Sequence, residues 1–387
     1  MYNLDEQAII FFSAFDLTYK KQQEIFSLTS NYSQLISNFN NYSKQIEKIV
    51  NDTTIFNDIC KNLSDNFLSD YINNLNKSNI QCLTICSKDY PESLKNIDQT
   101  PYILFCKGNI SLLKLDGIAI VGTRTPTSYG KIITEQFAKG LAINDFVIIS
   151  GMAAGVDTIS HRTALDNGGK TIAVLGSGFE HIYPAFNKEL FRKISEQGLL
   201  ISEYKPSTKP ALYTFPFRNR IIAGLSKGVL ITEAGEKSGS LHTKEYALEM
   251  GKEVFAVPGN IDCRNSAGTN ALLRDGASFA LSGSDILYEM MDRVPEKFRK
   301  IDSFGEESET EEKVAEQVTE TTVEDCEKHL SPFERSVINA LKTGKETYEE
   351  IMEFTQMEAA KLTSVLTIME IKGIIKLAFR NKYKLND

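Results

Sequence analysis

Short apolar runs alternate with helix-like segments between Gly117 and Ala280. Most of the runs are rich in Val, Ile and Leu, and most are followed by a turn with Gly or Ser and then by a stretch with helical spacing. Repetition of this unit is typical of βαβ crossovers on a parallel sheet. The pattern therefore predicts a doubly wound, mostly parallel, Rossmann-like α/β sheet. Its expected strands are Ile118–Val121, Phe146–Ile149, Thr171–Leu175, Leu199–Ile201, Val229–Thr232 and Val254–Val257.

The residues before this alternation have a different pattern. Apolar residues in the range 1–75 recur at helical spacing, which predicts a small N-terminal all-α domain. This domain is either a packing module or a DNA-binding helical hairpin. The segments Tyr90–Leu94 and Pro101–Cys106 are expected to add a strand or an embellishment at the sheet edge. The extended Rossmann-like domain is therefore expected to span residues 76–297.

The composition changes abruptly beyond the α/β region. Residues 298–328 are dense in acidic side chains and show no amphipathic period, so they predict a solvated linker. Three helical patterns and two short β-rich runs follow in residues 329–387, and together they predict a winged helix. Its elements are expected at Ser331–Leu341, Thr347–Glu353, Glu358–Glu370, Ile374–Lys376 and Lys382–Leu385.

Charge and composition narrow the class of protein. Hydrophobic residues make up 42% of the 387 and charged residues 24%, which is the balance of a globular protein. Eleven Asp or Glu and one Lys lie between Asp302 and Glu327, so the rest of the chain carries +2 of the net charge of −8. Charge alone therefore neither shows nor excludes a nucleic-acid ligand.

Several classes of site and location are not expected. The N-terminus is acidic where a secretory signal is basic, and nowhere do about 18 apolar residues run together, so a cytoplasmic protein without a membrane segment is expected. Six scattered cysteines and four separate histidines lack the spacing of zinc ligands, so we expect no metal site. The dinucleotide fingerprint, the P-loop and the G-x-S-x-G motif are absent, so no nucleotide cofactor and no triad hydrolysis are expected.

The turn after the first expected strand has the composition of an anion site. It runs from Gly122 to Gly130 and places Arg124 beside Thr123 and Ser128 at the start of a helix-like segment. The guanidinium offers a bidentate fork to phosphate, and small hydroxyl groups donate further hydrogen bonds. Since ligands of open parallel sheets bind at the carboxyl ends of the strands, this turn is a candidate phosphate site.

Glycine-rich loops follow later strands of the same sheet. They are Ser150–Asp157, Gly176–Gly178 and Gly235–Ser240, and their glycines would let the backbone approach a ligand closely. Each loop taken alone is more often a tight turn. Several phosphate-sized niches at one sheet edge nevertheless favour a polyanion over one small ligand.

The segment Lys209–Arg220 interleaves aromatic rings with cations and prolines. A single nucleic-acid strand needs both, because bases stack on rings and phosphates pair with Arg and Lys. The alternative is that Phe215 and Phe217 pack in the core while Arg218 caps a helix. The residues alone leave these two interpretations open.

Five runs taken in order resemble the signature of the DNA-processing protein A family (DprA/Smf). They are Val121–Arg124, Ser150–Asp157, Phe215–Ser226, Thr232–Ser240 and Val257–Asn260. The resemblance covers about residues 85–285, and the N-terminal all-α segment is similar in kind to the sterile-alpha-motif-like module of that family. The family pattern often has Ser at the position of Thr123, a change that keeps the hydroxyl group.

The resemblance implies a non-enzymatic homodimer that binds single-stranded DNA in a positively charged pocket and loads the RecA recombinase during natural transformation. Arg124 would then hold phosphate and Phe215 would stack a base. The implied DNA-binding residues are Gly122, Thr123, Arg124, Ser128, Gly151, Lys209, Phe215, Arg218, Asn219, Arg220, Gly235, Lys237, Ser238 and Gly239.

Two other functions compete with this hypothesis. A nucleotide phosphoribohydrolase of the lysine-decarboxylase-like (LOG) kind shares a related core, and Gly239–Glu245 is similar to its catalytic loop, but the Pro-Gly-Gly opening of that loop is missing. A transcription factor acting through the winged helix would leave most of the chain unexplained. The expected recognition helix also carries Glu358 and Glu370, which suit phosphate contacts poorly.

Overall fold

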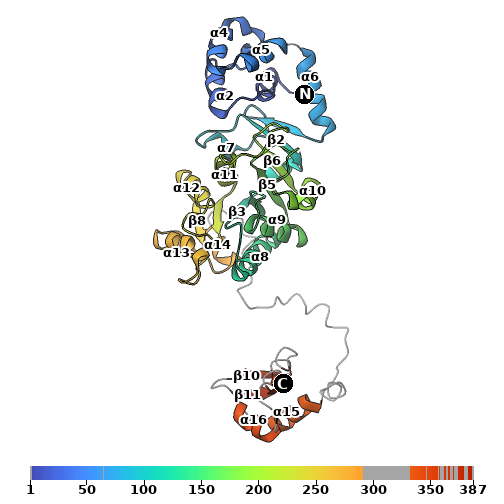
Figure 1. Ribbon diagram of the computed structural model, residues 1–387, viewed down its shortest axis with the longest axis vertical. Coiled ribbons are helices and arrows are strands. Elements are labelled where there is room, and N and C mark those ends of the chain that lie inside the picture. Colours follow the sequence, from blue (N-terminus) through green and yellow to red (C-terminus); the bar gives the residue numbers. More distant parts are fainter. Residues whose placement is uncertain are drawn as a thin grey trace. The chain divides into compact units, whose positions relative to one another are not determined.

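A mixed nine-stranded sheet forms the centre of the α/β region (Figure 1). The computed structural model describes residues 2–63, 65–290 and, with internal gaps, 332–385. Neighbouring strands follow the order β1-β2-β6-β5-β4-β3-β7-β8-β9. The strands are β1 (Gln81–Thr84), β2 (Ile103–Gly108), β3 (Gly117–Val121), β4 (Val147–Ser150), β5 (Thr171–Leu175), β6 (Leu199–Ser202), β7 (Gly228–Ile231), β8 (Glu253–Ala256) and β9 (Ser278–Phe279).

The predicted doubly wound sheet is confirmed. Strands β3 to β9 pair in parallel, and each of the six expected strands is present with its ends shifted by no more than one residue. The edge embellishment consists of β2, which pairs antiparallel with β6, and β1, which pairs antiparallel with β2. The segment Tyr90–Leu94 does not form a strand and instead leads into the short helix α7 (Glu92–Lys95).

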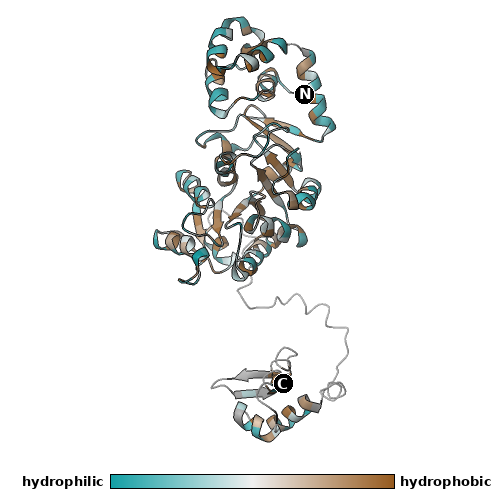
Figure 2. Ribbon diagram, in the orientation of Figure 1, coloured by the Kyte–Doolittle hydropathy of each residue, from teal (hydrophilic) through white to brown (hydrophobic). Residues whose placement is uncertain are grey.

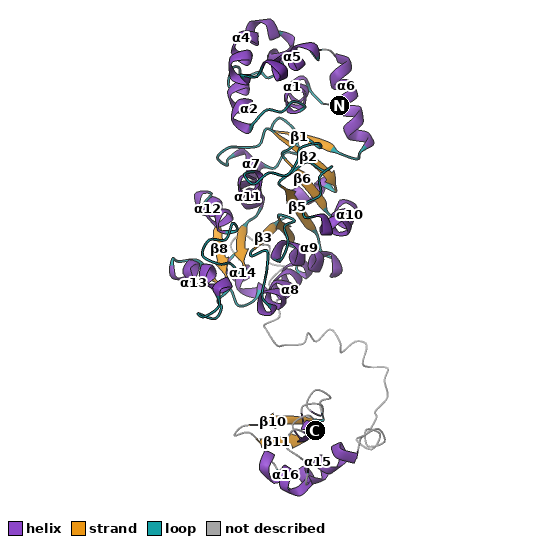
Figure 3. Ribbon diagram, viewed as in Figure 1, coloured by secondary structure: helices purple, strands orange, loops and turns teal. Residues whose placement is uncertain are grey.

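Helices cover both faces of the sheet (Figure 3). Alternation along β3 shows why: Ile118 and Ile120 share a hydrophobic core with the helices at 128–143, 156–166 and 283–289. Ala119 and Val121 share another core with α7 and the helices at 214–225, 241–249 and 267–274. None of the helices in the described ranges is long and apolar enough to span a bilayer. The helices after α7 are α8 (Ser128–Ile143), α9 (Val156–Asp166), α10 (Lys188–Gln197), α11 (Thr214–Leu225), α12 (Leu241–Glu249), α13 (Ala267–Arg274) and α14 (Gly283–Glu289), with 3-10 turns at Ile110–Lys114, Ala185–Asn187 and Arg264–Ser266.

The N-terminal residues are helical and share a hydrophobic core with one end of the sheet. Figure 2 shows apolar positions concentrated inside the sheet and on the inner sides of the helices. Polar contacts also join the N-terminal residues to the α/β region: among them, the amide of Cys82 donates to the Tyr2 hydroxyl at 3.1 Å, and Lys205 pairs with Asp16 at 2.8 Å. The helices are α1 (Leu4–Ser13), α2 (Tyr19–Phe26), α3 (Gln34–Ser37), α4 (Phe39–Val50), α5 (Thr53–Lys61) and α6 (Asp65–Lys77).

The order of the strands places the switch point of the sheet at β3. The chain proceeds from β3 to β4, β5 and β6 on one side, and then returns to place β7 and β8 on the other. The loops that leave β3 and β7 therefore begin next to each other at the carboxyl edge. Open α/β sheets bind their ligands in the crevice at this position.

The residues from 332 onward form a separate unit. It contains α15 (Pro332–Lys342), α16 (Tyr348–Thr355) and an antiparallel ribbon of β10 (Ile375–Ala378) and β11 (Lys382–Leu385). These elements lie where two helices and two strands of the winged helix were expected. The expected third helix, 358–370, and the expected linker, 298–328, fall largely or wholly outside the described residues, so the complete winged helix stays a prediction.

Helix α11 is anchored at its C-terminus by one lysine. The ammonium group of Lys252 donates to the carbonyl oxygens of Ala223 (2.7 Å), Gly224 (2.7 Å) and Ser226 (2.6 Å). The last carbonyls of a helix have no partners within the helix and lie at the negative end of its dipole. A single cation that satisfies three of them holds this end of α11 in place.

Replacement of Lys252 by Met should lower the free energy of unfolding by about 2 kcal/mol, because three carbonyls lose a charged donor. Urea denaturation followed by circular dichroism measures the change. Lys227→Met is the matched control: Lys227 is half-exposed, pairs with Asp116 at 3.3 Å, and should contribute less than about 1 kcal/mol. Equal losses in the two variants would contradict the anchoring role.

Candidate functional site

A cleft of about 450 Å³ opens at the switch point of the sheet. It is lined by the loops that follow β3, β4, β5 and β7 and by the first turns of α11 and α12. Segments far apart in the sequence thus meet at one edge, as the strand order requires. The cleft therefore lies where an open α/β sheet places its ligand.

An aromatic face with a cation beside it forms one wall of the cleft. The half-buried Phe215 ring packs on Gly176, where a Cβ atom would lie only 2.7 Å from the ring. Tyr183 tilts against Phe215 with 5.3 Å between ring centroids, and the exposed Arg124 guanidinium lies 5.8 Å from the Phe215 centroid. This wall offers ring surface and positive charge to a ligand at the same place.

Arg218 lies beneath the cleft rather than in its opening. Its side chain is 4% exposed, and Nη1 donates to the carbonyl oxygens of Gly151 and Val174. Gly151 leaves space for this guanidinium, because a Cβ atom there would lie 2.5 Å from Arg218 Nη2. We therefore attribute the glycine to the packing of Arg218 and not to the approach of a ligand.

Asp157 satisfies the amides of the loop after β4. Its Oδ2 accepts hydrogen bonds from the amides of Gly151 (3.1 Å) and Ala153 (3.2 Å). Burial raises the pKa of Asp157, and the Arg218 charge and the two amides offset part of that shift. Burial lowers the pKa of Arg218 to about 10, so the guanidinium stays charged at neutral pH. The donors of this loop therefore already have an anionic partner within the chain.

Glu233 fills the corresponding position at the N-terminus of α8. Its buried carboxylate accepts from the Thr127 amide at 2.8 Å and from the Thr127 hydroxyl at 2.7 Å. The predicted anion site at this helix start is therefore occupied by a side chain of the protein. Ser128 lines a neighbouring depression with Glu233 and Pro258 instead of the cleft.

The N-terminus of α12 has no such internal anion. Ser240 stands at its N-cap and makes no side-chain capping bond. Thr243, in the first turn, is 1% exposed, and its hydroxyl has no hydrogen-bond partner among the described residues. Gly239 leaves the approach open, since a Cβ atom there would meet nothing within 4 Å. This helix start and its unpaired hydroxyl border the cleft, and they can accept an anionic group.

The structure brings most of the predicted site residues together. Eight of them line the cleft, and Asn219 also holds the α12 loop through a 3.4 Å bond to the Gly239 carbonyl. The eight are Gly122, Thr123, Arg124, Phe215, Arg218, Asn219, Ser238 and Gly239.

The prediction that Arg220 lines a surface track for DNA is wrong. Its side chain is fully buried, bonds Glu203 at 2.6 Å and lies 3.9 Å from the centroid of the Phe217 ring, so it cannot line a surface track. Lys209 and Lys237 are exposed but do not line the cleft. Gly235 also lies outside the cleft, and a Cβ atom there would lie 3.4 Å from the carbonyl oxygen of Arg264.

Tyr183 and Thr243 are among the cleft residues that were missed from the sequence. Tyr183 follows the Gly176–Gly178 turn at the same sheet edge, and an aromatic residue just after a glycine-rich turn was the available signal. Thr243 gave only a weak signal, its position in the first turn of a helix that begins after Ser240. Its unpaired hydroxyl depends on tertiary packing.

The fold and the cleft define a doubly wound α/β protein with a ligand site at the switch point. The family model for DNA recombination-mediator protein A matches residues 81–291, which is more than half of the chain. The chain therefore belongs to the DNA recombination-mediator protein A family. This finding confirms the resemblance inferred from the five sequence runs.

Curated relatives agree with this assignment. The DNA processing protein DprA of Bacillus subtilis is 45% identical over 215 residues, a match that covers 55% of this chain and 72% of the relative. The DprA protein of Streptococcus pneumoniae is 47% identical over 200 residues, with coverage of 52% and 71%.

Two solved structures are also similar. The X-ray structure of Streptococcus pneumoniae DprA has a TM-score of 0.63 and 37% identity, and the match covers 74% of this chain and 98% of that one. Helicobacter pylori DNA processing protein A, described for its single-stranded DNA binding mode, has a TM-score of 0.50 and 33% identity, with coverage of 56% and 97%.

Replacement of Glu233 by Ala should lower the free energy of unfolding by about 2 kcal/mol, because the Thr127 amide and hydroxyl lose a charged acceptor at a helix start. Chemical denaturation measures the loss. Glu236→Ala, an exposed change in the same loop, should alter stability by less than about 0.5 kcal/mol. The capping role is refuted if the two variants unfold at the same denaturant concentration.

Proposed function

We propose that this protein binds single-stranded DNA in the cleft at the switch point and passes it to the RecA recombinase during recombination and natural transformation. The observation that carries the proposal is the wall made by Phe215, Tyr183 and Arg124. Rings there can stack an unpaired base, while the guanidinium pairs with an adjacent phosphate. A duplex would not expose its base faces to such a wall.

The α12 N-terminus supplies the second part of the proposed interface. Ser240 and Thr243 at this helix start line the cleft, whereas Glu233 already bonds the start of α8 and Asp157 already bonds the loop before α9. A phosphate of a bound strand would therefore lie at α12, across the cleft from Arg124. Stacking and phosphate contacts tolerate any base, which supports sequence-independent binding.

We propose binding without catalysis. The buried carboxylate of Asp157 already accepts hydrogen bonds from the amides of Gly151 and Ala153, so we assign it to holding this loop and not to proton transfer. Glu245, the counterpart of the phosphoribohydrolase glutamate, pairs with His242 at 3.0 Å and does not line the cleft. Both observations favour a binding protein over that enzyme.

Family membership supports the remaining parts of the proposal. A cytoplasmic homodimer that delivers single strands to RecA is the function expected of this family. We extend that expectation to this chain, together with protection of the strand while it is bound. Transfer is measured by the rate at which RecA assembles on a strand already coated with single-strand-binding protein, with and without this protein.

Arg124→Ala and Phe215→Ala should both weaken binding to a single-stranded oligonucleotide by about tenfold or more, because each removes a contact of about 1–3 kcal/mol. The two losses should differ in their salt dependence. Loss of one phosphate contact should reduce the slope of log affinity against log salt by about 0.7, whereas loss of a stacking ring should leave it unchanged. Fluorescence anisotropy at several salt concentrations measures both quantities.

The matched control is Arg274→Ala, since Arg274 is 80% exposed and lies in α13, outside the cleft. It should bind as the unaltered protein does. Full affinity in the Arg124 and Phe215 variants, or binding to duplex alone, would refute the proposed interface.

The Thr243→Val variant should lower the affinity for single-stranded DNA without lowering the stability of the fold. Valine keeps the shape of threonine and removes a buried hydroxyl that lacks a partner, so stability should stay equal or rise by about 1 kcal/mol. Affinity for single-stranded DNA should fall about fivefold, because a phosphate loses a donor. Thr269→Val is the control: the Thr269 hydroxyl already donates to Ser266, and its loss should reduce stability without affecting affinity. Unchanged affinity of Thr243→Val would exclude this phosphate position.

A further inference from the structure

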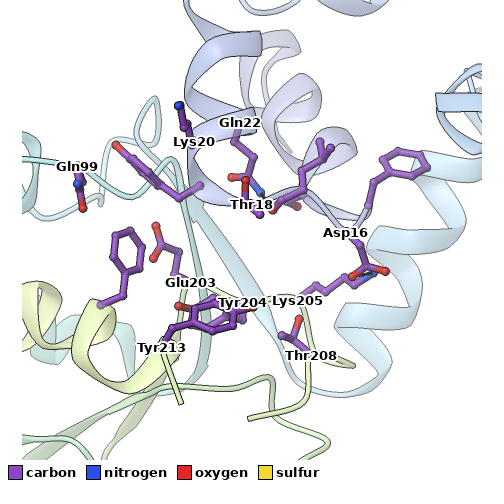
Figure 4. Close-up of a pocket in the computed structure, with 15 residues that line it drawn as sticks. Asp16, Thr18, Lys20, Gln22, Gln99, Glu203, Tyr204, Lys205, Thr208 and Tyr213 are labelled. Carbon is purple, nitrogen blue, oxygen red and sulfur yellow. Dashed lines mark hydrogen bonds and ion pairs between the residues drawn. The ribbon is translucent and has the colours of Figure 1, made fainter. Parts of the chain in front are cut away.

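A second pocket, of about 490 Å³, lies between the N-terminal helices and the α/β region (Figure 4). Helix α2 with the loop before it forms one side, and the segment after β6 together with α11 forms the other. Five aromatic residues line it: Phe15, Tyr19, Tyr204, Tyr213 and Phe217. None of the runs that resemble the family signature predicted this pocket.

The second pocket and the cleft share the start of α11. Leu212 lines the cleft, and the next residue, Tyr213, lines the pocket with 75% of its side chain exposed. The same alternation recurs one turn later, since Pro216 faces the cleft and Phe217 faces the pocket. A strand that crosses this helix start can therefore contact both hollows.

The pocket contains a buried acceptor without a partner. Glu203 is 9% exposed, and its Oε1 accepts from Arg220 at 2.6 Å. Its Oε2 has no hydrogen-bond partner among the described residues. Figure 4 shows Glu203 between Tyr213 and Thr18, at the centre of the lining. A carboxylate oxygen in this state requires a donor, and the pocket lining itself provides none.

The charges of the pocket favour a neutral group over a phosphate. Glu203 is balanced by Arg220, and Asp16 is balanced by Lys205 at 2.8 Å. Lys20 at the rim is exposed and has no ion pair among the described residues. The rings and the carboxylate inside the pocket match a nucleobase that bears an amino group. The cation at the rim matches the phosphate of the same nucleotide, which would stay outside the pocket.

We propose that this pocket is a second base-binding subsite, which takes an amino-bearing nucleobase of the strand held in the cleft. The base stacks on Tyr213, and its exocyclic amino group donates to Glu203. The proposal rests on the proposed single-stranded DNA function and extends the bound strand across the start of α11 to the N-terminal helices. Cytosine carries the required amino group, whereas thymine has a carbonyl oxygen in the same position.

The test compares oligo-dC with oligo-dT of equal length in the full-length protein. For strands of about ten nucleotides, oligo-dC should bind about fivefold more tightly, because only cytosine donates to Glu203. Glu203→Gln keeps an oxygen for Arg220 but offers an amide donor, so it should abolish or invert this ratio. Tyr213→Ala should weaken the binding of both long oligonucleotides about tenfold and should leave the binding of strands of about four nucleotides unchanged.

Tyr288→Ala is the matched control, because Tyr288 is also 75% exposed and lies in α14, outside both hollows. Circular dichroism and thermal denaturation should show that all three variants are folded. The ratio of dC to dT affinity is a readout that a general loss of structure would not shift selectively.

The outcomes separate this proposal from the function on which it rests. The cleft function stands if the unaltered protein binds long strands and Arg124→Ala weakens that binding. The base subsite is then refuted if the ratio of dC to dT affinity is one, or if Glu203→Gln leaves the ratio unchanged. A pocket that instead binds a peptide segment of another protein would give that result. If no single strand binds, both proposals fail.

Discussion

The buried guanidinium of Arg218 is the contact on which the arrangement of the cleft depends. It bonds the carbonyls of Gly151 at the end of β4 and of Val174 in β5, and so ties α11 to the carboxyl ends of two strands. A charge in this position requires compensation, which Asp157 provides through the same loop. Phe215 lies about one turn before Arg218 on α11, so the same contact sets the position of the stacking ring. The buried packing of Arg218 therefore holds this wall of the cleft in position.

A second constraint decides where an anion can bind. Three helices that begin at this edge, α8, α9 and α12, have N-terminal amides in need of acceptors. Glu233 bonds the start of α8, and Asp157 bonds two amides of the loop that precedes α9. The start of α12 borders the cleft without an internal carboxylate, and its neighbour Thr243 has an unpaired hydroxyl. Glycine-rich loops that look equivalent in the sequence thus differ in function, because the chain already occupies two of the three anion positions.

The sequence predicted the sheet well and the site in part. Alternating βα units specify a doubly wound sheet because the periodicity is local, and each expected strand was found within one residue. Arg124 was predicted because it follows a strand, and Phe215 because it belongs to an aromatic-basic run. Arg220 was misplaced, since the same run does not reveal which cation turns inward, and Glu203, which pairs with it, lies seventeen residues away. The carboxylate of Glu233 could not be assigned to the start of α8, because it reaches Thr127 across 106 residues only after the loops meet in the fold.

The central claim is that a single DNA strand lies against the Phe215 wall, and photocrosslinking tests it most directly. A single-stranded oligonucleotide with 5-iodo-deoxyuridine at successive positions would be irradiated with the full-length protein, and the adducts mapped by mass spectrometry. We predict adducts on Phe215 and Tyr183, in peptides that contain the start of α11 and the loop after β5. Adducts confined to residues 332–385, or none above the level given by duplex DNA, would contradict the account.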